Sequence, residues 1–133
     1  MRRSTLVWMV LACAGALVSA NTALAGATAR ADVSIFSSLG FASGSIGSVH
    51  NSSDATQSIG CHAFADSVGG FSGECSATDL SGNTVHCTMV NNPAILDAIL
   101  ALGSDSFLTF GWNRGPDCTF VQFETSSSYE AKR

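Results

Sequence analysis

Charged side chains are scarce in this chain, and basic ones are scarcer than acidic ones. Lys and Arg together number 6 of the 133 residues, against 10 Asp and Glu, which gives a formal net charge of −4 at pH 7. Beyond the N-terminal Arg2 and Arg3, the basic residues are Arg30, Arg114, Lys132 and Arg133, and they form no cluster among aromatic side chains. Because an acidic surface repels the phosphate backbone, this composition excludes DNA and RNA as partners.

Residue patterns that hold nucleotides or cofactors are also absent. The chain has no nucleophile elbow, no zinc-protease helix motif, no phosphate-binding loop and no dinucleotide fingerprint. The glycines of Gly69–Cys75 open a strand pattern rather than a helix, and the acidic turn Asp79–Asn83 is too short for a calcium loop. We therefore expect no cofactor, no metal and no enzymatic activity.

A single long apolar run lies at the N-terminus, from Thr5 to Ala20. Arg2 and Arg3 precede it, and Ala23 and Ala25 follow in the small-x-small arrangement that signal peptidase accepts. The run is shorter than the roughly 20 residues that a transmembrane helix needs. These features predict a signal peptide over residues 1–25, no transmembrane segment, and a secreted protein, periplasmic or extracellular, with a single domain over residues 26–133. A lipoprotein cleavage box ending at Cys13 is the weaker alternative, because the apolar run continues past that residue.

The remaining cysteines are an even set in an exported chain: Cys61, Cys75, Cys87 and Cys118. Structural zinc sites draw their cysteines in pairs about two to four positions apart, and no two of these are so close. Their number and the exported context therefore predict two disulfides.

Period-two alternation from Ile59 to Met89 predicts three antiparallel strands in a meander. Turn signals interrupt the alternation at Asp66–Gly70 and at Asp79–Asn83. Symmetric turns there would pair Cys61 with Cys75, His62 with Glu74, Cys75 with Cys87 and Ser76 with His86. One face would bury Ile59, Cys61, Ala63, Ala65, Phe71, Cys75, Ala77, Val85, Cys87 and Met89. The other would expose His62, Phe64, Glu74, Ser76, Thr78, Thr84, His86 and Thr88.

Two disulfide schemes fit this register, because Cys75 faces a cysteine on either side. Directly opposed residues of an antiparallel pair can meet the geometry of a disulfide. We favour Cys61–Cys75 with Cys87–Cys118, since the second bond would tie the C-terminal part of the chain to the meander. The alternative is Cys75–Cys87 with Cys61–Cys118.

The flanking segments complete the predicted fold. Asn92 and Pro93 predict the start of one helix, with Gly103 as a left-handed residue ending it. After it, Ser106–Asn113 and Cys118–Thr125 form a hairpin pattern. Its core residues would be Phe110, Trp112, Val121 and Phe123. Upstream we expect a strand over Asp32–Phe36, a hairpin built from Gly44–Asn51 and Ala55–Gly60, and core contacts from Val33, Ile35, Phe36, Leu39 and Phe41. The fold class is thus mainly β, an antiparallel meander or sandwich of about six strands with one helix packed on it and two disulfides.

Two groups of residues are candidate binding sites. His62, Glu74 and His86 would share the exposed sheet face, where a carboxylate beside an imidazole could orient it. A flat sheet face offers no pocket, so the favoured interpretation is an ordinary polar surface rather than a catalytic or metal site. The second group, Trp112, Asn113 and Arg114, would place an aromatic ring, an amide and a cation at a hairpin tip.

The functional hypothesis is a small secreted binding protein whose partner is an extracellular or periplasmic protein or a carbohydrate. A secreted inhibitor of a protease or lysozyme-like enzyme is the first alternative, because a small rigid disulfide scaffold with an exposed loop suits that role. A small secreted hydrolase is the second. The general layout resembles that of small exported bacterial β-proteins, and this resemblance assigns no site.

Overall fold

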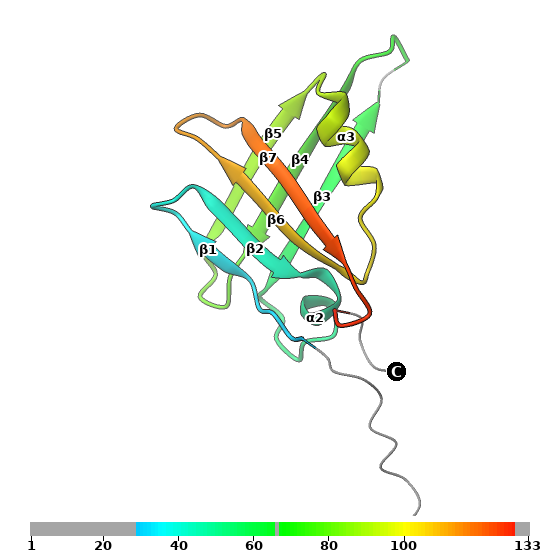
Figure 1. Cartoon of the computed structure of the whole chain (residues 1–133). Coiled ribbons are helices and arrows are strands. Elements are labelled where there is room, and N and C mark those ends of the chain that lie inside the picture. Colours follow the sequence, from blue (N-terminus) through cyan, green and yellow to red (C-terminus); the bar gives the residue numbers. More distant parts are fainter. Residues whose placement is uncertain (1–28, 66, 130–133) are drawn as a thin grey trace, which may run out of the picture.

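The computed structural model describes residues 29–65 and 67–129 (Figure 1). Within them, the elements in chain order are β1 (Ser34–Phe36), β2 (Phe41–Ser45), α2 (Ile46–His50), β3 (Ser58–Ala65), β4 (Phe71–Thr78), β5 (Thr84–Val90), α3 (Pro93–Leu100), β6 (Ser106–Trp112) and β7 (Cys118–Thr125). The predicted signal peptide and Cys13 lie outside the described residues.

Two antiparallel sheets face each other in a sandwich. The first has the strand order β1-β2-β6-β7 and the second β3-β4-β5, and their strands cross steeply in Figure 1. The core between them contains Val33, Ala42, Ile59, Cys75, Ala77, Cys87, Met89, Ile95, Ile99, Leu108 and Phe110. The prediction of a mainly β fold with one packed helix and two disulfides is confirmed, with seven strands in the described residues.

The predicted register of the meander is confirmed. Cys61 pairs with Cys75 and His62 with Glu74, and Ser76 pairs with His86 across the next strand. The predicted inner face is right for its central residues but wrong for Ala63 and Ala65, which are exposed. Ala63 and Ala65 lie toward the end of the β3–β4 hairpin, which extends past the four-stranded sheet (Figure 1).

Both disulfides follow the favoured scheme. Cys61 is bonded to Cys75 with a Cα–Cα distance of 4.0 Å, and Cys87 to Cys118 with a Cα–Cα distance of 4.9 Å. The second bond joins β5 of one sheet to β7 of the other. Two disulfides indicate an oxidising environment for the folded chain. Among the described residues, no helix is long and apolar enough to span a membrane.

Helix α3 begins as the sequence predicts and ends differently. The Asn92 side chain accepts a hydrogen bond from the Ile95 N–H, and Pro93 is the first helical residue. Ile95 and Ile99 are buried, and the glycine at position 73 of β4 lets the helix come close: a Cβ there would lie 3.3 Å from Ile99 Cδ1. The prediction that a left-handed Gly103 ends the helix is wrong, because the cap residue is Ala101, whose backbone is in the right-handed helical region.

The N-terminal prediction needs the largest correction. β1 and β2 form the hairpin, and β2 pairs with β6, whereas Ile46–His50 is a short helix rather than a strand. Local hydrogen bonds explain the helix: Ser45 Oγ accepts from the Ser48 N–H, and Asn51 donates from its side chain to the Gly47 carbonyl. Phe36 and Leu39, expected in the core, are 41% and 70% exposed.

The turn after β4 contains a carboxylate, that of Asp79, whose contribution to stability should decrease in acid. The Asn83 side chain donates to Asp79, as do the backbone N–H groups of Asn83 and Ser81, and these bonds lower the pKa of Asp79 below 3.8. Because the pKa is lowered in the folded state, the carboxylate stabilises the fold above pH 3.8, and this contribution is lost as the pH falls through the folded-state value. Carboxyl titration by NMR should give Asp79 a midpoint below the ordinary aspartate value of 3.8, and Asp79→Asn should make unfolding less pH-dependent in acid. A midpoint at or above that value would contradict the turn geometry.

Candidate functional site

The outer face of the three-stranded sheet brings together the three residues predicted there. His62 and Glu74 are directly opposed on β3 and β4, and His86 lies on β5 opposite Ser76, one register step away. The two imidazoles are exposed and Glu74 is half-buried. Among the described residues, no group of three or more His, Cys, Asp and Glu side chains is placed to hold a metal ion. This face is therefore a flat polar surface around two histidines.

The loop between β6 and β7 carries the second predicted group. Trp112 is half-buried, with its ring centroid 6.0 Å from that of Phe110 in the core. Asn113 and Arg114 are exposed, and the Asn113 side chain accepts a hydrogen bond from the Gly115 N–H. The Thr88 N–H donates to the Pro116 carbonyl at 2.7 Å, so the loop is anchored on β5. The Trp112 ring thus contributes to packing, while the amide and the guanidinium extend from an anchored loop.

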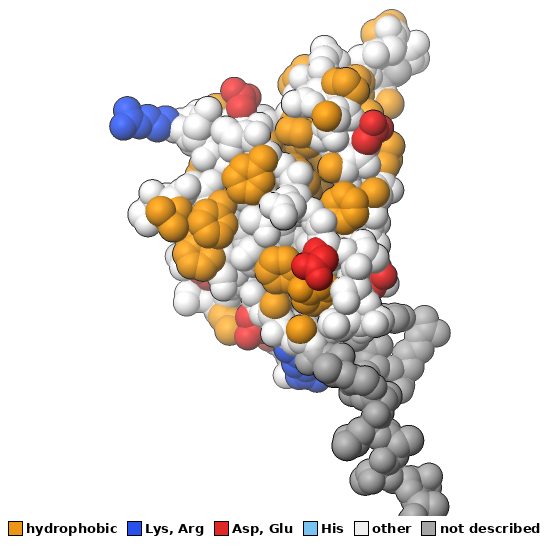
Figure 2. Space-filling model, viewed as in Figure 1, with side chains coloured by type: hydrophobic (Ala, Val, Ile, Leu, Met, Phe, Trp, Pro, Cys, Tyr) orange, Lys and Arg blue, Asp and Glu red, His pale blue; other side chains and the backbone are white. Residues whose placement is uncertain are grey.

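The outer face of the four-stranded sheet carries a surface that the sequence reasoning missed. Phe36 pairs with Phe41, Phe41 with Gly111, and Gly111 with Phe120, so one cross-strand row runs over β1, β2, β6 and β7. We call these four residues the aromatic row. Figure 2 shows hydrophobic side chains gathered over these strands on the face turned toward the viewer.

The rings of the aromatic row have two arrangements. Phe36 and Phe41 are stacked on each other, with ring centroids 4.5 Å apart and an interplanar angle of 22°. Phe120 lies over Gly111 so closely that a Cβ at position 111 would collide with its ring. The absence of a side chain at Gly111 leaves room for this ring on the sheet, and Phe120 is 42% exposed. Phe120 thus presents aromatic surface to solvent.

Uncharged hydrogen-bonding side chains lie next to the aromatic row. The neighbouring register positions form a polar row of Ser34, Ser43, Thr109 and Gln122. On its other side, the rings of Phe107 and Tyr129 are in contact, with centroids 5.3 Å apart. The two rows contain no ionisable side chain, in an acidic protein. Aromatic rings and neutral hydrogen-bonding groups therefore share this face, with the Glu124 carboxylate, paired with Phe107, beside the polar row.

The signal for this surface was present in the sequence in part. Gly40 with φ +71° closes the turn between Phe36 and Phe41, and a glycine after a short polar stretch marks such a hairpin. That turn would have placed the two rings opposite each other. No local sequence signal relates these two rings to Phe120, because Phe120 is brought into the row only by the long-range pairing of β2 with β6.

Comparison of the chain with protein-family models, with curated proteins and with solved structures gave no match. The functional argument therefore rests on the surfaces of this molecule. Of these, the aromatic row with its polar row has the more specific chemistry, because it combines open ring surface with aligned neutral donors and acceptors.

Proposed function

We propose that the protein is a secreted, non-enzymatic binding protein that recognises a neutral polysaccharide on the outer face of its four-stranded sheet. The observation that carries this proposal is the exposed ring of Phe120 in line with Phe36 and Phe41, beside the polar row. The two disulfides are consistent with an extracellular or periplasmic location.

The chemistry of the two rows matches that of a sugar ring. The face of an aromatic ring is negatively polarised, so it attracts the weakly positive C–H groups on the apolar face of a pyranose. The hydroxyl groups at the edge of the same sugar can exchange hydrogen bonds with Ser43, Thr109 and Gln122. A polymer without charge suits the two uncharged rows, whereas an acidic polysaccharide would be repelled by Glu124, which pairs with Phe107 on the same face, and by the net charge of −4.

The test is a binding isotherm on insoluble neutral polysaccharides, with cellulose, chitin and an insoluble β-glucan as probes. Wild-type protein should be depleted from solution by at least one of them and not by an acidic polymer such as polygalacturonate. Phe120→Ala and Phe36→Ala should each weaken binding about tenfold, since an aromatic contact contributes about 0.5 to 1.5 kcal/mol.

Phe64→Ala is the matched control, because Phe64 is 63% exposed on the outer face of the other sheet. This variant should bind like the wild type. Circular dichroism shows whether each variant is folded, so that lost binding can be distinguished from lost folding. If Phe120→Ala does not fold, Phe36→Ala still tests the proposal. Absence of binding to all neutral probes, or an equal loss in Phe64→Ala, would refute the proposal.

A further inference from the structure

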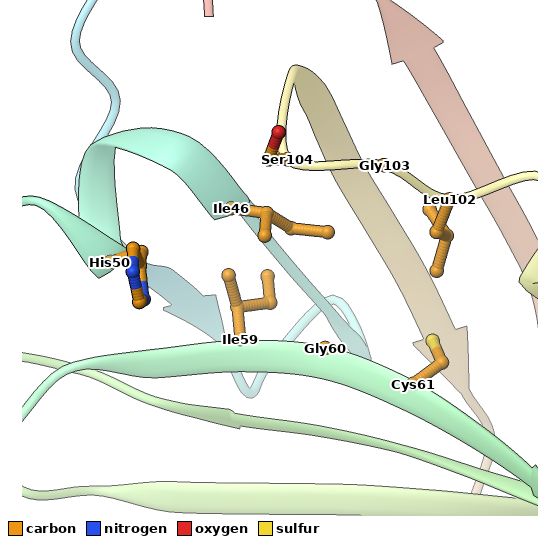
Figure 3. Close-up of a pocket in the computed structure, with 8 residues that line it drawn as sticks. All are labelled: Ile46, His50, Ile59, Gly60, Cys61, Leu102, Gly103 and Ser104. Carbon is orange, nitrogen blue, oxygen red and sulfur yellow. The ribbon is translucent and has the colours of Figure 1, made fainter. Parts of the chain in front are cut away.

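A pocket lies on the side of the sandwich, away from both outer sheet faces. It has a volume of about 430 Å³ and is lined by Ile46 and His50 of α2, by Ile59, Gly60 and Cys61 of β3, and by Leu102, Gly103 and Ser104 of the loop before β6. Figure 3 shows the side chains of Ile46, Ile59, Leu102 and Cys61 pointing into a common space, with His50 at one end. None of these residues belongs to the aromatic row or the polar row.

The wall formed by α2 is fixed by close backbone packing. A Cβ at Gly47 would collide with the Ser104 carbonyl oxygen and would lie 2.6 Å from the Tyr129 carbonyl oxygen, so the helix is packed directly against two other segments. Asn51 closes the helix by donating from its side chain to the Gly47 carbonyl at 2.7 Å. The helix therefore cannot move into the pocket without losing these contacts.

The opposite walls are fixed by covalent and hydrogen bonds. Cys61 is bonded to Cys75, which is fully buried in the core. The loop is held where the Gly103 N–H donates to Ser106 Oγ at 2.9 Å and the Ser106 N–H donates to the Gly103 carbonyl. Since all three walls are anchored, the pocket is present before any ligand arrives, which lowers the cost of binding.

The lining decides the class of ligand. Ile46, Ile59 and Leu102 offer aliphatic surface, and the Cys61 sulfur adds a soft apolar contact. The imidazole of His50, which is exposed at the end of the pocket, can donate or accept a hydrogen bond. The pocket is open to solvent rather than enclosed, and its volume lies in the range of sites for small organic molecules, which are mostly apolar with a few placed polar groups.

We infer that this pocket binds a small amphipathic molecule, with an aliphatic body among Ile46, Ile59 and Leu102 and an oxygen head group hydrogen-bonded to His50. A polysaccharide chain does not fit this description, so the site is separate from the one under the proposed function. The protein would thus hold two different ligands on two surfaces that share no residue.

The experiment is a methyl-detected NMR titration of the purified protein with octanoate and, separately, with octan-1-ol. Saturable shifts should appear at the methyl groups of Ile46, Ile59 and Leu102 and at the His50 ring, with at least one of the two probes. A response to octanoate alone assigns a carboxylate head group, and a response to both assigns any oxygen head group. No saturable shift with either probe, or shifts confined to the aromatic row, would overturn the inference.

Two pairs of variants localise the ligand. Leu102→Trp fills the pocket from a half-buried position and should abolish binding, whereas Leu100→Trp, the same change at a 70% exposed position of α3, should not affect it. His50→Ala should weaken binding of the responding probe about tenfold, and His86→Ala, on the outer face of the three-stranded sheet, should leave it unchanged. The backbone NMR spectrum of each variant reports its fold. Unchanged binding in folded Leu102→Trp would refute the site.

Discussion

Replacing both Cys87 and Cys118 with alanine is expected to lower the free energy of unfolding by about 4 kcal/mol. The bond joins residues 31 positions apart, and closing a loop of that length removes much of the entropy of the unfolded chain. It also connects strands of different sheets, β5 and β7, so its loss removes a covalent link between the two sheets. Urea denaturation of oxidised wild type and variant, followed by the fluorescence of Trp112, measures the difference.

The second disulfide provides the comparison. Cys61 and Cys75 are 14 positions apart on paired strands, so their replacement should cost about 3 kcal/mol by the same relation. His86→Ala is the control for a substitution beside Cys87, and its exposed side chain predicts a change of no more than about 0.5 kcal/mol. If removing the Cys87–Cys118 bond costs no more than His86→Ala, the bond does not hold the sheets together.

The three-stranded sheet was predictable because its information is local. Each strand pairs with the next through a short turn, and Gly69 and Gly82 have the positive φ values that such turns need. Once the turn centres are fixed, every cross-strand pair follows, including Cys61 with Cys75. The register left two disulfide schemes open, and the favoured one was chosen because its second bond ties the C-terminal part of the chain to the meander.

The four-stranded sheet was not predictable in the same way. β2 pairs with β6 across more than half of the described chain, and no turn signal relates two segments so far apart. Without that pairing, Phe36 and Leu39 were assigned to the core on hydrophobicity alone. The structure shows instead that β2 buries Ala42 against β6, while Phe41 lies on the opposite face.

The candidate sites also differ in whether local or long-range pairing assembles them. His62, Glu74 and His86 were placed on one face because that face belongs to the local meander. The aromatic row combines an N-terminal hairpin with the last strand, and the pocket combines α2, β3 and the loop before β6. Both of these depend on long-range packing, so that neither could be assembled from a pattern within one segment.

Phe110→Ala is expected to destabilise the protein by about 3 to 5 kcal/mol. Phe110 is fully buried between the sheets, where its β-strand neighbours are Ala42 and Val121 and its ring contacts Trp112. Truncation removes the transfer free energy of the ring and leaves a cavity that these fixed strands cannot fill. The same urea series measures the loss.

Phe64→Ala is the control for that substitution, because it deletes the same ring from a 63% exposed position and should change stability by no more than about 0.5 kcal/mol. The contrast tests how far packing, rather than a covalent bond, holds the two sheets together. Phe110 is the largest fully buried side chain of the described residues, and it extends from the four-stranded sheet toward the three-stranded one. A loss below about 1 kcal/mol in Phe110→Ala would mean that the two sheets do not pack on this ring, and the sandwich itself would then be wrong.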